Sequence, residues 1–332
     1  MVFLDLVKSS NTKLPSHLVA VFVGGTSGIG EYALKAFAKH CKHPRAYFIG
    51  RSQKAADRIS SELKTLNPDG EYIFMRMDTG LLKNVDKACQ ELKAKEKVIN
   101  ILFITTGTLS SGTDTEEGLH LAASLIVHSR TRFMLNLLPL LRAAPDLRRV
   151  VSVMAGTKEG PFVNEDFQCR NVPLMRARGQ GASTITLSLE TVAKMAPEVS
   201  FIHDFPGPVR SNIARDPGFV PFILKAIFKV FGPLVYIPND ESGERHLYLA
   251  TSAQYPPHDG EASGVPVGGG LAIAHGTNGK PGSGVYTVDQ HCESGGAKNE
   301  ELLAKLRTEG WDKKIWDHIQ GEFVRITGKE SI

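Results

Sequence analysis

A glycine-rich turn near the start of the chain carries residue types that can hold a phosphate. It lies between an apolar run at 18–23 and a segment of helical periodicity at 31–40, and it reads Gly24-Gly25-Thr26-Ser27-Gly28-Ile29-Gly30. Glycines let the backbone turn tightly and approach a pyrophosphate, and a helix N-terminus offers unpaired N–H groups and a positive dipole end. The turn therefore predicts a dinucleotide site, with contacts expected at Gly24, Thr26, Ser27, Gly28, Ile29 and Gly30.

The residues after the second apolar run indicate which dinucleotide binds. An NAD site usually has Asp or Glu there, which accepts hydrogen bonds from the ribose 2′-hydroxyl. This chain has Gly50-Arg51-Ser52 instead, without a carboxylate, and a guanidinium can hold a 2′-phosphate through two hydrogen bonds. We therefore expect NADP(H), with Arg51 and Ser52 at its phosphate. The alternative is that Arg51 is a solvated surface charge.

Apolar strands and amphipathic helices alternate along the chain and supply the frame for this turn. The strands are expected at 18–23, 46–49, 72–75, 101–104, 150–154 and 199–202, and the helices at 31–40, 53–66, 81–95, 117–142, 182–194 and 311–326. Such alternation requires right-handed crossovers and a parallel sheet covered on both faces. The pattern predicts an α/β fold with a doubly wound parallel sheet, a Rossmann fold, in a single domain over residues 1–332.

The last third of the chain has a different composition. Residues 222–231 are strongly apolar, and residues 260–284 are rich in glycine. Pro233 ends the apolar segment short of the roughly 20 residues that a membrane-spanning helix needs. We expect a cofactor-binding core at 15–215 and an extension at 216–332, in which 219–236 forms an apolar lid helix over the substrate. Plain core and a membrane-surface helix are the alternatives.

Composition limits the remaining classes of partner. Lys and Arg exceed Asp and Glu only by 39 to 35 and are scattered, which gives no electrostatic case for nucleic acid. The four cysteines form no closely spaced pair, so we expect neither a metal site nor disulfides. The N-terminus lacks the apolar run of a signal peptide, and we expect a cytoplasmic protein. The partner is expected to be a small-molecule substrate, and a homo-oligomer stays possible.

The chain resembles the short-chain dehydrogenase/reductase superfamily. Gly24, Gly28 and Gly30 match the glycines of its cofactor turn, while Val23 replaces a threonine. Three further landmarks follow in order, and they are Met77-Asp78-Thr79, Thr105-Thr106-Gly107 and Pro206-Gly207-Pro208-Val209-Arg210-Ser211. The resemblance implies further cofactor contacts at Asp78, Thr106, Gly107, Pro206, Gly207, Val209 and Ser211.

The same resemblance exposes a gap in the catalytic centre. Reductases of this family use Asn, Ser, Tyr and Lys, in which the tyrosine gives a proton to a carbonyl as hydride arrives. By alignment to the family these positions fall on Ile126, Ala155, Val172 and Arg176, and no tyrosine occurs between residues 72 and 236. Valine cannot donate a proton. Arg176 can still hold the ribose hydroxyls, but it stays protonated and is a poor acid.

A few polar residues remain near the expected pocket. The chain is similar to long fungal members with a Glu-x-Gly-Glu-Arg helix, here Glu241–Arg245. Some fungal members that lost the four residues run cyclisations, including Diels–Alder reactions, with NADP(H) bound, and position the substrate with an Arg and an Asp. By this resemblance Arg130 and Asp166 are the candidate catalytic residues beside Arg176. Lys158 and Glu159 lie near them in sequence.

Three functions stay open at this point. The leading one is an NADP(H)-binding enzyme of fungal natural-product biosynthesis that lacks the proton relay. It would act as a cyclase or isomerase, or reduce an iminium-type substrate. The second is a conventional carbonyl reductase with another proton donor. The third is a catalytically silent NADP(H)-binding protein.

Overall fold

One parallel sheet of seven strands organises the molecule. The computed structural model describes residues 1–108, 112–163, 165–210 and 236–332. The strand order is β3-β2-β1-β4-β5-β6-β7, and every neighbouring pair is parallel. The order in which strands are added to the sheet therefore changes direction between β1 and β4, and such folds bind ligands at this point. The predicted doubly wound fold is confirmed.

The strands are short, and the inner ones are buried on both faces. Their bounds are β1 Val19–Val23, β2 Arg45–Gly50, β3 Glu71–Arg76, β4 Ile101–Ile104, β5 Arg149–Val153, β6 Ser200–Asp204 and β7 Val285–Val288. Alternate residues enter opposite cores, so that Val21 packs on one face of the sheet and Phe22 on the other. Burial on both faces explains why the inner strands are continuous apolar runs.

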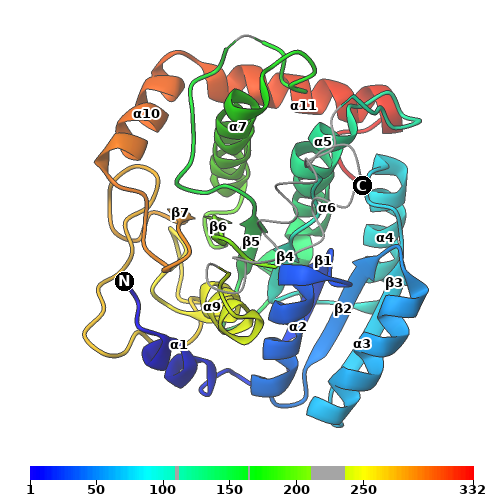
Figure 1. Ribbon diagram of the computed structural model, residues 1–332, viewed down its shortest axis with the longest axis vertical. Helices are drawn as coiled ribbons and strands as arrows, with labels where there is room; N and C mark the ends of the chain where they lie inside the picture. The colour runs from blue at the N-terminus through cyan, green and yellow to red at the C-terminus, as the bar shows by residue number, and fades with distance from the viewer. Residues whose placement is uncertain (109–111, 164, 211–235) are drawn as a thin grey trace.

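Helices cover both faces of the sheet (Figure 1). One layer consists of α4 Leu82–Lys95, α6 Ser129–Arg142, α7 Leu174–Met195, α10 Ala297–Thr308 and α11 Trp311–Thr327. The other consists of α1 Leu4–Asn11, α2 Gly28–His40, α3 Gln53–Leu66 and α9 Asn239–Thr251. No helix in the described part of the chain is long and apolar enough to cross a membrane.

The helix expected at 117–142 begins later and contains an irregular turn. Its first residues form α5 Leu121–Ala123, followed by the π-helical segment η1 Ser124–His128 that runs into α6. Glu117 lies outside the helix because its carboxylate accepts hydrogen bonds from the backbone N–H groups of Leu82 and Lys83, at 2.6 and 3.0 Å. It thus satisfies two free donors at the N-terminus of α4.

Helix α7 begins eight residues before the predicted start at Ala182. The extra turns contain Gly179 and Gly181. Gly179 is required by a close approach, since a Cβ there would lie 3.0 Å from the Gly160 Cα. The Gly160 N–H also donates to the Gly179 carbonyl at 3.0 Å. Tertiary contact therefore outweighs the low helix propensity of glycine here.

The C-terminal extension contributes to the sheet itself. β7 was not predicted, although Ile202 of β6 pairs with Tyr286 of β7. Helices α1 and α10 were not predicted either. The expected lid at 219–236 lies outside the described residues apart from Tyr236, and Ser211 lies outside them as well.

Candidate cofactor and substrate site

The glycine turn joins β1 to α2 in a conformation that only small residues allow. Gly24 has φ +91°, and a Cβ on it would lie 2.6 Å from the Thr105 Oγ1. A Cβ on Gly30 would lie 2.7 Å from the same oxygen. The Gly24 and Gly25 N–H groups donate to the Ile49 carbonyl, at 3.0 and 3.2 Å. The backbone is thus held against β2 and β4, and the N-terminus of α2 at Gly28 is left to face a ligand.

The residues after β2 and β3 form the adjacent part of the site. Arg51 is 73% exposed, and its Nη1 lies 3.8 Å from Oδ2 of Asp78. Ser52 is the N-cap residue of α3, where its Oγ accepts a hydrogen bond from the Ala55 N–H at 3.3 Å. The Asp78 Oδ1 accepts from the Gly80 N–H at 3.0 Å. An exposed guanidinium held this loosely is available to an added phosphate.

The π-helical turn contains Ile126, the residue that the alignment predicts at the family's asparagine position. A π-turn breaks the regular hydrogen-bond pattern and often marks a functional site. The carbonyl of Leu125 accepts instead from Arg130 Nε at 3.3 Å and from Thr106 Oγ1 at 3.5 Å. The turn thereby ties α6 to the loop after β4, which carries Thr106 and Gly107.

Arg130 lies in the wall beneath this loop and is 2% exposed. Its Nη1 donates to the Ser152 Oγ at 2.7 Å and the Val153 carbonyl at 2.9 Å, and its Nη2 donates to the Thr106 carbonyl at 2.5 Å. Burial lowers the pKa of the Arg130 guanidinium to about 9, which leaves it charged at neutral pH. The side chain joins the carboxyl ends of β4 and β5.

The four residues that the alignment predicts at the relay positions lie between η1 and the first turn of α7. Ile126 is half-buried in η1, Ala155 is buried after β5, and Val172 is buried just before α7. Arg176 occupies the first turn of α7 and is exposed. None of the four carries a side chain that donates a proton readily at neutral pH.

A buried chain of hydrogen bonds begins at the backbone of Ala155. The Ala155 N–H donates to Nε2 of His203 at 3.2 Å, so the imidazole proton lies on Nδ1. His203 Nδ1 lies 2.8 Å from Thr186 Oγ1, which in turn donates to Glu159 Oε1 at 2.7 Å. The His203 and Glu159 side chains are fully buried. This chain fixes the loop after β5 to β6 and α7.

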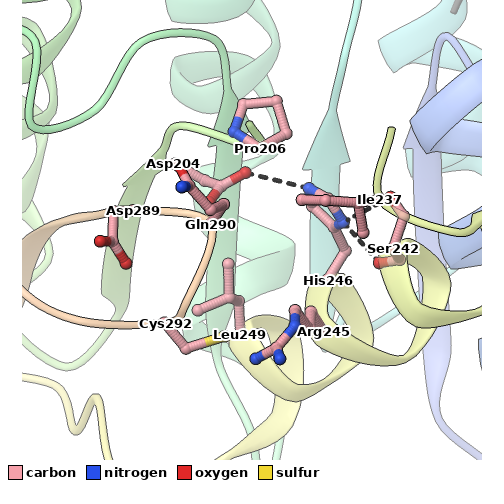
Figure 2. Close-up of a pocket in the computed structure, with 10 residues that line it drawn as sticks. All are labelled: Asp204, Pro206, Ile237, Ser242, Arg245, His246, Leu249, Asp289, Gln290 and Cys292. Atoms are coloured by element: carbon pink, nitrogen blue, oxygen red, sulfur yellow. Dashed lines mark hydrogen bonds and ion pairs between the residues drawn. The ribbon is translucent and has the colours of Figure 1, made fainter. Parts of the chain in front are cut away.

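The Pro206-Gly207 segment follows β6 after one residue, Phe205, and the last residue of β6 contacts α9. The Oδ2 of Asp204 lies 3.0 Å from Nε2 of His246 on α9, and Figure 2 shows the two side chains pointing toward one another beside Pro206. Burial raises the pKa of the Asp204 carboxyl, while His246 opposes this shift. The Ser242 Oγ lies 3.3 Å from Nδ1 of His246. The cavity beside these residues has a volume of about 10 Å³, which is room for one water. The group therefore anchors α9 and is too enclosed for a substrate.

Asp166 lies in the loop between β5 and α7 and is half-buried. Its Oδ2 accepts from the Asn171 N–H at 2.8 Å, and its carbonyl accepts from Gln180 Nε2 at 2.8 Å. The neighbouring Phe167 ring lies 5.1 Å from the ring of His318 on α11. The loop is thus fixed on both α7 and α11, with Asp166 between them.

A cleft of about 660 Å³ opens between this loop and the start of α7. It is lined by Lys158, Gly160, Pro161, Phe162, Val163, Arg176, Arg178 and Gly179. The sequence had indicated Arg176 and Lys158, but not Arg178 or the ring of Phe205, over which Arg178 and Lys158 both lie. The Arg-x-Arg spacing after Pro173 was the available signal.

The structure therefore groups the predicted residues into two parts of one edge of the sheet. The residues after β1 to β4 are the glycine turn, Arg51, Ser52, Asp78, Thr106 and Gly107. The residues after β6 are Pro206, Gly207 and Val209. Arg176 and Asp166 lie beyond β5, on the side of the cleft. The carboxyl ends of parallel strands meet at this edge, and dinucleotides bind there.

No family model matches the chain, but curated proteins and solved structures similar to it were found. The chain is 37% identical to the protein named Oxidoreductase AN1596 of Emericella nidulans, over 96% of this chain and 97% of that one. It is 30% identical to Short-chain dehydrogenase/reductase SAT2 of Stachybotrys chartarum, over 96% of each. The solved structure of L-sorbose reductase from Gluconobacter frateurii, in complex with NADPH and L-sorbose, has a TM-score of 0.55 at 17% identity. That alignment covers 77% of this chain and 97% of the reductase.

Proposed function

The chain belongs to the short-chain dehydrogenase/reductase family, and we propose that it binds NADP(H) but acts without the family's proton relay. One observation carries this proposal. The glycine turn keeps a shape that a Cβ at Gly24 or Gly30 would obstruct, while the relay positions hold Ala155 and Val172. We propose an enzyme of the fungal biosynthetic type that acts on a small organic intermediate, either by cyclisation or isomerisation or by reducing an iminium-type substrate.

The residues of the cradle fit a phosphorylated dinucleotide. The N-terminus of α2 and the turn before it would hold the pyrophosphate, and Arg51 with Ser52 would hold the 2′-phosphate. Asp78 is expected at the adenine and the Pro206-Gly207 segment at the nicotinamide. When bound, NADPH supplies a hydride. The absence of a carboxylate after β2 supports NADP(H) over NAD(H), since the nearest carboxylate to Arg51, on Asp78, is 3.8 Å away and exposed.

The relay positions restrict the substrates that such a site can reduce. Reduction of a ketone ends with an alkoxide that needs a proton, and general acids supply such protons with a gain of ~10²–10⁴-fold. An iminium ion needs no proton when it accepts hydride, and a cyclisation needs only correct positioning. Both alternatives are compatible with valine at position 172.

Asp166 and Arg130 have different parts in this proposal. We propose that the Asp166 carboxylate pairs with a cationic amine or iminium, which the side chains at the relay positions cannot do. Arg130 was expected to bind a substrate carbonyl, but its guanidinium already donates to three backbone carbonyls and to Ser152. We therefore propose Arg130 as a positioning residue that holds the loop of Thr106.

The test compares simple ketones with a cyclic iminium ion in the presence of NADPH, following products and NADPH absorbance separately. Ketone turnover should be slower by ~10²–10⁴-fold than acid-assisted reduction. Conversion of the iminium ion should fall in Asp166→Asn and stay unchanged in Asp317→Asn, an exposed carboxylate on α11. Rapid reduction of ordinary ketones by the parent protein contradicts the proposal.

A further inference from the structure

The cleft beside α7 is lined by two cations, Lys158 and Arg178, that have no part in the proposed function. We propose that it binds a carboxylate carried by the same substrate, through Lys158, Arg178 and Arg176. This inference rests on the proposed function and adds a substrate class to it. The juxtaposition that carries it is two cations that contact a single aromatic ring and that line a cleft with apolar residues.

The two cations are fixed by Phe205, the residue that precedes the Pro206-Gly207 segment. The Lys158 Nζ lies 5.0 Å from the centre of the Phe205 ring, and the Arg178 Cζ lies 5.1 Å from it. Both distances are within the range of a cation–π interaction. Lys158 lies in the loop after β5 and Arg178 lies in α7, so the fold brings the two charges together. A ring that holds two cations presents them together at the nicotinamide side of the site.

The three cations of the cleft are not engaged in ion pairs within the described part of the chain. Neither Lys158, Arg178 nor Arg176 forms an ion pair with any carboxylate that the structure describes. The closest acid in sequence, Glu159, is fully buried and accepts its hydrogen bond from Thr186. Like charges this near one another repel, and the N-terminal end of the α7 dipole adds positive potential. An anion in the cleft would offset both the repulsion between the cations and the positive potential of the helix N-terminus.

The shape of the cleft indicates what is attached to the anion. Its volume of about 660 Å³ suits a small organic molecule. The lining also contains the apolar residues Phe162, Pro161 and Val163, and the centre of the Phe162 ring lies 4.3 Å from that of Trp311 on α11, in a stacked arrangement. Val163 is 43% exposed, as expected for a side chain that contacts a ligand. The ligand is therefore an apolar body with a carboxylate at one end.

The experiment measures calorimetric binding of two matched probes, cinnamate and cinnamyl alcohol, to the protein saturated with NADP+. Cinnamate should bind at least ~10-fold more tightly than the alcohol, because charge-assisted hydrogen bonds form only with the carboxylate. The double variant Lys158→Met/Arg178→Met should lose that advantage and keep the affinity for the alcohol. The control Lys298→Met/Lys305→Met removes the same charge from α10 and should behave like the parent.

Equal affinity for the two probes, no binding of cinnamate, or an unchanged preference in the Lys158→Met/Arg178→Met variant overturns the inference. NADP+ is titrated into every variant as a separate readout. Loss of cinnamate binding with NADP+ binding intact concerns the cleft alone. Failure of NADP+ to bind the parent protein counts against the proposed function instead.

Discussion

Arg130 is a buried cation whose neighbours are neutral. Such a charge is stable only when its donors are paired, and here the partners are the carbonyls of Leu125, Val153 and Thr106 with the hydroxyl of Ser152. These contacts lie between the π-turn and the ends of β4 and β5. The sequence identified Arg130 as important by resemblance. The sequence alone could not show whether Arg130 donates to a substrate or to backbone carbonyls, because its partners are 5 to 24 positions away.

Replacing Arg130 tests this structural role. Arg130→Met leaves buried carbonyls without donors, each at a cost of roughly 1–3 kcal/mol, so urea unfolding should show a clear loss of stability. The control is Arg142→Met at the end of the same helix, where an arginine 52% exposed pairs with Glu198. That change should stay within about 0.5 kcal/mol. If Arg130→Met keeps the parental stability but no longer converts the iminium ion, Arg130 contacts the substrate and the structural role is wrong.

At the scale of elements, α9 explains the Glu-x-Gly-Glu-Arg motif. Gly243 lets α9 approach α2, because a Cβ there would lie 2.7 Å from the Tyr32 carbonyl oxygen. The Glu244 carboxylate accepts hydrogen bonds from Asn11, His40 and Lys39. Burial alone would raise the pKa of this carboxyl, but the three hydrogen bonds outweigh burial and lower the pKa to about 2. The motif therefore fixes α1 and α9 to the helix whose N-terminus forms the cofactor turn.

Two glycines inside helices give a matched test of this contact. Gly243→Ala should destabilise the protein, because overpacking against the backbone of α2 typically costs about 1–3 kcal/mol. Gly321→Ala on α11 meets nothing within 4 Å and should stabilise by about 0.5–1 kcal/mol through helix propensity alone. Thermal unfolding of both variants measures the difference. An equal gain in both would show that α9 does not pack tightly against α2.

For the whole molecule, the predictable features were those encoded locally. The inner strands are continuous apolar runs, so their order of appearance and the glycine turn could be predicted from the sequence. β7 could not, since its four residues follow the glycine-rich stretch and form a strand only by pairing with β6. The start of α7 depends on the contact of Gly179 with Gly160, and the cleft depends on Phe205 bringing Lys158 and Arg178 together. Each of these contacts joins distant parts of the chain.

The central claim is that this fold still holds NADP(H) at the turn between β1 and α2. It is tested most directly by calorimetric titration of NADP+ and NAD+ into the parent, into Arg51→Glu and into the control Lys298→Glu. The parent and the control should bind NADP+ more tightly than NAD+ by about 1–3 kcal/mol, the range of charge-assisted hydrogen bonds. Arg51→Glu should erase that preference. Equal affinities in the parent, or no binding of either dinucleotide, would contradict the account.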